Sequence, residues 1–270
     1  MNAEQRPVSG QIDVRNLSVS FDVGGKPMVA LDRLSFSVRP GEFVCLLGTS
    51  GCGKSTVLNV IAGFIPPTQG EVVVDSWTIQ GPGPDRGMVF QGHALFPWKT
   101  VWQNIEFGLK MTGLQEPERS RRVGHLLTLV GLRGFEQHYP AELSGGMEQR
   151  VGLARVLALD SVVLLMDEPF GALDAQTRML MQELLLDIWE QSKRTVVFVT
   201  HDVEEAILLA DRILVLTARP ARVKQEITVP LTRPRNYDVV TTTEFVTIKQ
   251  QALALIREES LRTHPSLPTP

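Results

Sequence analysis

The sequence is poor in cysteine and has no long apolar run, and each shortage excludes a class of protein. Only two cysteines occur among 270 residues, and Cys45 and Cys52 lie close together within one local segment. They make a poor disulfide framework, so they indicate a reducing compartment such as the cytoplasm. Uninterrupted apolar runs, such as residues 162–166 and 196–199, are far shorter than the ~20 residues that span a bilayer. The chain is therefore predicted not to cross a membrane.

A strong net charge is also missing. Lysine and arginine number 27 against 30 for aspartate and glutamate, which leaves a net charge of -3. No global positive field then attracts nucleic acid, and we expect no nucleic-acid partner. Hydrophobic residues make up 43% and charged residues 21% of the chain, which is typical of folded domains. The length allows one large domain or two small ones.

What the sequence does contain is an alternation of strand and helix patterns. Period-two alternation over residues 11–21 and 34–38 predicts antiparallel strands at the start of the chain. Helical spacing follows over residues 54–62. Further along the chain, short apolar strands alternate with helices, which indicates a parallel sheet with helices on both faces. The continuous apolar runs that predict its buried strands lie at 43–47, 162–166, 195–199 and 213–216.

The pattern changes between residues 90 and 160. Runs of β-branched residues disappear there, and amphipathic stretches at 121–130 and 146–159 predict a helical insertion. After residue 219 the chain is rich in proline until a helical pattern covers 244–258. This last segment is expected to be a packed helix, with a regulatory or dimer-stabilising tail as the alternative.

A glycine-rich loop follows the strand at 43–47. It fits the pattern of Gly, four residues, Gly, Lys and Ser, and it opens a helix. Glycine lets successive backbone N–H groups point at one anion, and the helix N-terminus adds its positive end. Lys54 would then reach the β- and γ-phosphates, and the Ser55 hydroxyl would bind Mg²⁺. The nucleotide-binding residues predicted here are Gly48, Thr49, Ser50, Gly51, Cys52, Gly53, Lys54, Ser55 and Thr56.

Two carboxylates end the strand at 162–166. Asp167 and Glu168 should lie at the carboxyl edge of the sheet, on the same rim as the phosphate loop. Asp167 suits the Mg²⁺ shell, and Glu168 suits activation of the attacking water. The sequence therefore predicts a site for ATP and Mg²⁺.

These segments, together with Leu-Ser-Gly-Gly-Met at 143–147, resemble the ATP-binding subunit of ABC transporters over nearly the whole chain. The 143–147 tract is the most specific element, because kinases, GTPases and helicases share the phosphate loop. The resemblance implies one ABC ATPase domain of α/β class with a P-loop NTPase core, a parallel sheet, an N-terminal antiparallel β subdomain and a helical insertion. Its expected parts are 12–91 and 160–218 (core and β subdomain), 92–159 (helical subdomain) and 219–270 (C-terminal extension).

The resemblance also implies roles for single residues. Gln91 matches the glutamine that takes part in metal binding and catalysis, and His201 matches the histidine that contacts the γ-phosphate. Asp174 matches an aspartate close to the nucleotide. Phe21 matches the aromatic residue that stacks on adenine, although an aromatic residue in a strand is more often part of the core.

A second anion-binding helix start is predicted by the 143–147 tract. Ser144, Gly145 and Gly146 precede the helical pattern there, which suits phosphate. In the family, this signature caps the ATP on the phosphate loop of a partner. The resemblance therefore implies a homodimer or a paired ATPase subunit, with two ATP molecules between the subunits. It further implies membrane permease subunits, an indirect solute-binding protein, and a peripheral location on the cytoplasmic face of the bacterial inner membrane.

Within the family, residues 90–105 and 170–178 resemble subunits of importers for nitrate, sulfonate and taurine. The alternative is the ATPase of an exporter or lipid-extraction system. A DNA-repair ATPase would need a long coiled-coil insertion, for which the stretch between Gln91 and Leu143 is too short.

Two local expectations concern reactivity and docking. Cys52 lies at a helix start, so we expect its thiolate to be stabilised and its alkylation to block ATP binding. Phe96, Pro97 and Trp98 are expected to form a groove for a short helix of a membrane subunit.

Overall fold

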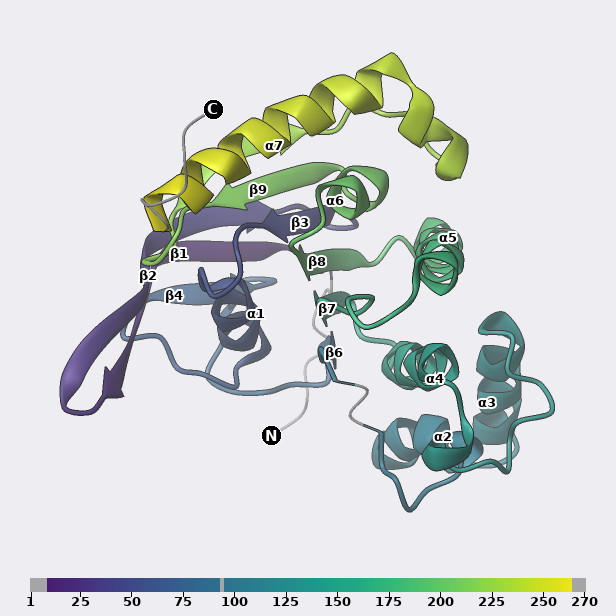
Figure 1. Cartoon of the computed structure of the whole chain (residues 1–270). Coiled ribbons are helices and arrows are strands. Elements are labelled where there is room, and N and C mark those ends of the chain that lie inside the picture. The colour runs from purple at the N-terminus through teal and green to yellow at the C-terminus, as the bar shows by residue number, and fades with distance from the viewer. Residues whose placement is uncertain (1–8, 93–94, 264–270) are drawn as a thin grey trace.

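Two sheets organise the computed structural model, which describes residues 9–92 and 95–263 (Figure 1). The smaller sheet is antiparallel and has the strand order β2-β1-β4-β5. Its strands are β1 (Ile12–Val23), β2 (Lys26–Val38), β4 (Gln69–Val74) and β5 (Trp77–Thr78). The antiparallel subdomain expected at the N-terminus is therefore present, and it is completed by two strands that come later in the chain.

The larger sheet has the order β10-β9-β3-β8-β7-β6. Its strands are parallel except for β10, which pairs antiparallel with β9. The strands are β3 (Phe43–Leu47), β6 (Arg86–Val89), β7 (Val163–Asp167), β8 (Thr195–Thr200), β9 (Arg212–Leu216) and β10 (Val223–Thr228). The central strands are buried on both faces, which explains their continuous apolar sequence.

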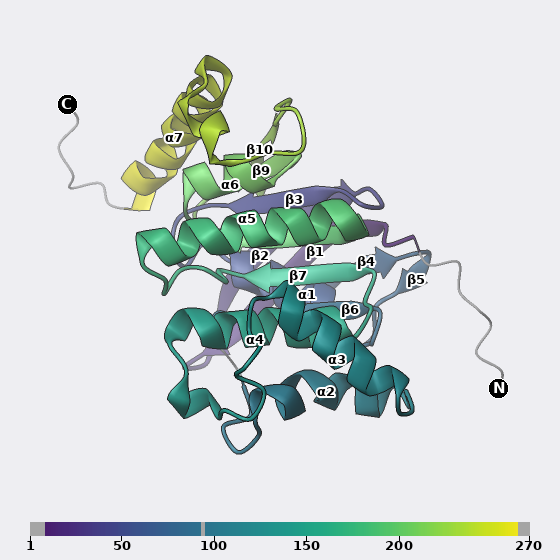
Figure 2. The ribbon, with the colours of Figure 1, turned by 90° about the vertical axis from the view of Figure 1, so that its right-hand side faces the viewer.

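Each face of the larger sheet packs against a different layer. Val44 and Leu46 of β3 pack with the antiparallel sheet and with α1 (Lys54–Ala62). Phe43, Cys45 and Leu47 point to the opposite face, which is covered by helices (Figure 2). Those helices are α4 (Gly145–Ala158), α5 (Ala175–Ser192), α6 (Val203–Leu209) and α7 (Thr243–Thr263). Helices were expected on both faces, and α1 does lie on the first face, where it shares the cover with the antiparallel sheet.

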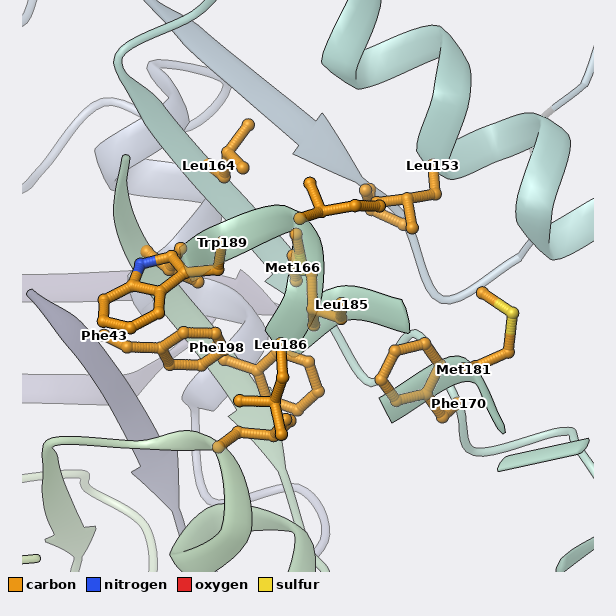
Figure 3. Packing of buried hydrophobic residues seen from close by; sticks show 14 of the residues in the cluster. Phe43, Leu153, Leu164, Met166, Phe170, Met181, Leu185, Leu186, Trp189 and Phe198 are labelled. Atoms are coloured by element: carbon orange, nitrogen blue, oxygen red, sulfur yellow. The ribbon is translucent and has the colours of Figure 1, made fainter. Parts of the chain in front are cut away.

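Aromatic rings fill the helical side of the sheet. The ring centroid of Phe43 lies 5.9 Å from those of both Trp189 and Phe198. Figure 3 shows these rings packed beside Met166, Leu185 and Leu186. Trp189 belongs to α5, so this contact holds α5 against β3, a central strand of the sheet.

The helical insertion contains α2 (Val101–Met111), α3 (Glu118–Leu129), a short 3-10 turn (Pro140–Glu142) and α4, which together form a lobe beside the sheet (Figure 2). The sequence patterns predicted α3 and α4 but not α2. A capping box starts α2, because Thr100 and Gln103 satisfy each other's backbone N–H groups. Buried Asn104 donates to the carbonyl oxygens of Phe96 and Lys99, which holds the preceding loop against the helix.

The C-terminal extension is packed into the same core. After β10, a 3-10 turn (Tyr237–Thr241) leads into α7, and Phe245, Ile248 and Ala252 of α7 are buried with residues of the sheet. Buried Arg235 donates hydrogen bonds to five carbonyl oxygens. These belong to Ile207, Leu208, Ala210, Val229 and Leu231. Burial lowers the pKa of Arg235 to about 10, so the side chain keeps its charge at pH 7.

No helix in the described ranges combines the length and the apolar content that crossing a bilayer requires.

We expect Arg235→Met to lower the free energy of unfolding by about 3 kcal/mol, because methionine fills the space but leaves buried carbonyl groups without a donor. Urea unfolding monitored by circular dichroism measures this change. Arg257→Met on the exposed side of α7 is the control and should stay within about 0.5 kcal/mol of the parent protein. Equal stability of the two variants would contradict the role of Arg235 as the donor to these carbonyl groups.

Candidate active site

The phosphate loop connects β3 to α1 at the carboxyl edge of the parallel sheet. Gly51 and Gly53 have φ values of +73° and +122°, which side chains other than glycine rarely adopt. A Cβ atom on Gly53 would also lie 3.0 Å from a methyl carbon of Leu31. The loop conformation therefore depends on glycine at both positions.

Lys54 is folded over this loop. Its Nζ donates to the carbonyl oxygens of Gly48 and Thr49 at 2.9 and 3.1 Å, and it lies 3.8 Å from an Oε atom of Glu168. Only 4% of the residue is exposed. The cation is thus held between the loop and the acidic end of β7.

Ser55 and Asp167 form the second contact of the site. The Ser55 Oγ donates to Asp167 Oδ1 at 2.9 Å, which joins the start of α1 to the end of β7. Burial raises the pKa of Asp167, and the hydrogen bond from Ser55 opposes part of that rise. A hydroxyl and a carboxylate therefore lie side by side as hard oxygen donors, the ligand type that Mg²⁺ takes.

Glu168 and His201 form the third contact. The Nδ1 atom of His201 lies 3.0 Å from Glu168 Oε2, and the histidine side chain is 60% exposed. Glu168 has a φ of +44°, and its N–H donates to Val199 O at 3.0 Å. This strained backbone turns the carboxylate away from the strand and toward the rim, which is typical of functional sites.

The 143–147 tract starts α4 as expected. The Ser144 side chain caps the helix by accepting a hydrogen bond from Met147 N. Gly145 has open space around it, whereas a Cβ atom on Gly146 would lie 2.6 Å from a methyl carbon of Thr177. Gly146 therefore allows close packing of α4 against α5.

Two further residues support this part of the site. The Gln149 amide of α4 donates to the carbonyl oxygen of Pro169, next to Glu168. Sequence reasoning missed Gln149, which lies within the segment that carried the family resemblance. Asp174 caps α5 by accepting from Gln176 N and Thr177 N, and the hydrogen bond with Thr177 lowers the pKa of its carboxyl group.

Some expected residues lie outside this hydrogen-bonded group. Gln91 follows β6 and is exposed, and Phe21 is half-buried on β1 opposite Met28 of β2. Within residues 9–92 and 95–263, no hydrogen bond joins Gln91, Phe21 or Ser144 to Lys54, Asp167 or Glu168. Phe21 also packs on the core of the antiparallel sheet, so it has a structural contact besides its expected role.

The expectation of a stabilised Cys52 thiolate is wrong, whereas the block of ATP binding by its alkylation stays a prediction. Its side chain is 2% exposed, and a Cβ atom on Gly48 would lie 2.9 Å from its Sγ. Burial raises the pKa of the thiol, although nearby Lys54 acts in the opposite direction. Backbone N–H groups of Lys54 and Cys52 also lower this pKa, but burial outweighs them, so the thiolate is not stabilised.

An apolar groove of about 460 Å³ lies between α2 and the core. Its lining includes Phe64, Phe90, Phe96, Phe107 and Met111. Trp98 lies next to it and is 71% exposed, with its ring centroid 5.8 Å from that of Phe96. The expected groove thus includes Phe96, while Trp98 stands at its margin.

A phosphate loop on β3 and paired acids at the end of β7, joined through Ser55 and Asp167, define a P-loop NTPase. The ABC transporter family matches residues 31–171, more than half of the chain. The protein belongs to this family and is an ATP-binding ATPase, as the resemblance implied.

Curated relatives share most of their length with this chain. An ABC transporter ATP-binding protein of Methanocaldococcus jannaschii is 47% identical over 94% of each chain. The nitrate import ATP-binding protein NrtD of Synechocystis is 48% identical and covers 91% of this chain and 95% of its own. The taurine import ATP-binding protein TauB of Burkholderia pseudomallei is 56% identical over 77% of this chain and 80% of its own.

A solved structure confirms the fold. A dimeric post-hydrolysis state of the ATP-binding cassette MJ0796, bound to ADP and phosphate, has a TM-score of 0.73 and 32% identity. The match covers 82% of this chain and all of that one. The predicted α/β fold class is therefore correct.

We expect Cys52 to react slowly with iodoacetamide at pH 7.5, because a buried thiol with a raised pKa contains little thiolate. The rate should rise as the pH approaches the raised pKa. Mass spectrometry of the 48–55 peptide measures the labelling, and the same protein unfolded in guanidinium is the control. Labelling of the folded protein at the unfolded rate would contradict the assignment.

Proposed function

We propose that this chain is the ATP-hydrolysing subunit of an importer for a small anion such as nitrate, sulfonate or taurine, working with separate membrane permease subunits. The observation that carries the catalytic part is the gathering of Lys54, the Ser55–Asp167 pair and the Glu168–His201 pair at one sheet edge. The names of the nitrate and taurine relatives support the import direction. They do not favour the alternative, an exporter or lipid-extraction ATPase.

The donor set fits a magnesium ion. Ser55 and Asp167 offer adjacent oxygen atoms, and Asp167 is buried enough to gain from a cation beside it. We propose that these two residues, with Gln91 from the end of β6, hold Mg²⁺. When bound, the ion neutralises charge on the phosphate oxygens.

The remaining residues have separate roles in hydrolysis. The loop from Gly48 to Thr56 binds the phosphates through its backbone N–H groups, and Lys54 neutralises the β- and γ-phosphate oxygens. Glu168 accepts a proton from the attacking water. His201 holds the Glu168 carboxylate through the 3.0 Å contact, and its exposed ring is available to the γ-phosphate. Phe21 stacks on adenine.

The second phosphate-binding helix start requires a second subunit. Ser144, Gly145 and Gly146 lie at the start of α4 and are not bonded to the Lys54 group within the described residues. We propose that they cap the ATP held by the phosphate loop of a second copy or of a paired ATPase subunit, with Asp174 near that interface. Because the γ-phosphate is bound from both sides, ATP favours the closed pair and hydrolysis releases it. The dimeric MJ0796 structures support the dimer.

The apolar groove beside α2 supports a permease contact. Aromatic side chains line it and Trp98 stands exposed at its margin, which suits a short amphipathic helix from a membrane subunit. The chain would then be peripheral, on the cytoplasmic face of the bacterial inner membrane. A solute-binding protein would act on the permease and reach this subunit only indirectly.

We expect Glu168→Gln to lower ATP hydrolysis by about 10²- to 10⁴-fold, because the amide cannot accept the proton. ATP-bound dimers should accumulate for the same reason. Phosphate release measures the rate, and light scattering measures the mass with saturating ATP and Mg²⁺. Glu118→Gln at the partly exposed start of α3 is the control. A Glu168→Gln protein that stays monomeric would contradict the proposed dimer with ATP bound between its subunits.

We expect Trp98→Glu to lower transport by at least about tenfold while basal ATPase activity stays within about twofold, because the charge disturbs the groove and not the nucleotide site. Uptake of nitrate, taurine and an alkanesulfonate into vesicles that contain the co-purified permease is the readout. Trp77→Glu on exposed β5 is the control. Equal loss of both activities would contradict the docking role, and outward movement of labelled lipid would identify the exporter alternative.

A further inference from the structure

An arginine of the C-terminal extension contacts the phosphate loop. Arg219 lies between β9 and β10, and its Nη2 donates to the carbonyl oxygen of Gly51 at 2.7 Å. Its Nη1 lies 3.0 Å from the sulfur of Met28. Met28 pairs with Phe21 in the β1–β2 ladder. One guanidinium group therefore bridges the phosphate loop and the strand pair that carries the proposed adenine-stacking ring.

The contact at Gly51 controls the shape of the loop. The Gly51 carbonyl and the Cys52 N–H belong to one planar peptide unit, so fixing one end orients the other. The Cys52 N–H donates to Thr49 O at 3.3 Å. Gly51 has a φ of +73°, a backbone conformation that glycine adopts readily and other residues rarely do. Arg219 thus holds the Gly51 carbonyl from outside the loop, whereas Lys54 holds the Gly48 and Thr49 carbonyls from within it.

The position of Arg219 is fixed by its own hairpin. Ala221, two residues later, exchanges backbone hydrogen bonds with β2, through Ala30 O at 2.9 Å and Asp32 N at 3.1 Å. Arg222 bonds to the Asp32 carboxylate and so faces β2 instead of the phosphate loop. The two arginines of this turn therefore have different partners.

Helix α7 holds the other side of the hairpin. The Ala218 N–H donates to Glu259 Oε2 at 2.9 Å, and Glu259 is 1% exposed. Lys224 of β10 lies 2.7 Å from the other carboxylate oxygen. Burial alone would raise the pKa of Glu259, but the hydrogen bonds from Lys224 and Ala218 hold it below its usual value. A charged, buried carboxylate of α7 is thus bonded to the residue next to Arg219.

We propose that Arg219 is a positioning residue for the nucleotide, and that Glu259 of α7 positions Arg219 through the Ala218 backbone. The C-terminal helix then contributes to nucleotide affinity without touching the nucleotide. This inference rests on the proposed ATP site, and it gives the C-terminal extension a part in that site's geometry.

The test compares nucleotide binding by Arg219→Ala, Arg219→Lys and Arg222→Ala, with a fluorescent ATP analogue and with ADP. Arg219→Ala should weaken both roughly five- to tenfold, the effect of losing one ordinary hydrogen bond. It should raise KM for ATP by the same factor while kcat stays within about twofold. Arg219→Lys should restore part of the affinity, because an amine still donates to Gly51 O. Arg222→Ala should bind as the parent does.

Glu259→Gln tests the connection to α7. It should weaken nucleotide binding, as Arg219→Ala does, but by a smaller factor. The thermal unfolding temperature of the variant is measured alongside. Unchanged affinity in Arg219→Ala, or an equal loss in Arg222→Ala, would overturn the inference. A parent protein that binds no ATP would instead reject the proposed function, so the two failures are distinct. Because both arginines are exposed, their variants decide the role of Arg219 even if Glu259→Gln unfolds, and unchanged affinity in a folded Glu259→Gln protein would overturn the connection to α7.

Discussion

The hydrogen bond between Ser55 and Asp167 connects residues 112 positions apart, and the active site depends on it. It requires that β3 and β7 run in the same direction and end at the same edge, with β8 between them. Because these strands are parallel, the glycine loop, the acidic pair and His201, which follow their carboxyl ends, lie at the same edge of the sheet. The buried faces of the sheet hold that order through packing on both sides.

The strands of this sheet were predictable because burial on both faces requires unbroken apolar sequence, as in 43–47 and 195–199. Helix α2 was not predicted, although its capping box at Thr100 and Gln103 was a readable signal. The phosphate loop and the acids follow from local sequence. The contact from Gln149 to Pro169 depends on how α4 sits beside β7, and no local pattern encodes that distance.

The prediction for Cys52 failed for a related reason. Burial of this thiol beside Gly48 raises its pKa by more than the backbone N–H groups of Lys54 and Cys52 lower it. The arginines of the C-terminal extension show the opposite case. The sequence predicted a packed helix for this segment but no partners for its arginines, whereas Arg219 and Arg235 both bind backbone carbonyl groups. Their side chains organise the chain's backbone, which charge counting does not reveal.

The bond between Gln149 and Pro169 also has a mechanical consequence. Gln149 belongs to the helical lobe, and Pro169 follows Glu168 directly in the chain. A shift of α4 relative to β7 must therefore either break this hydrogen bond or move the Pro169 carbonyl with it. One side chain thereby couples the helical lobe mechanically to the acidic end of β7, because neither can shift far without the other while this hydrogen bond is intact.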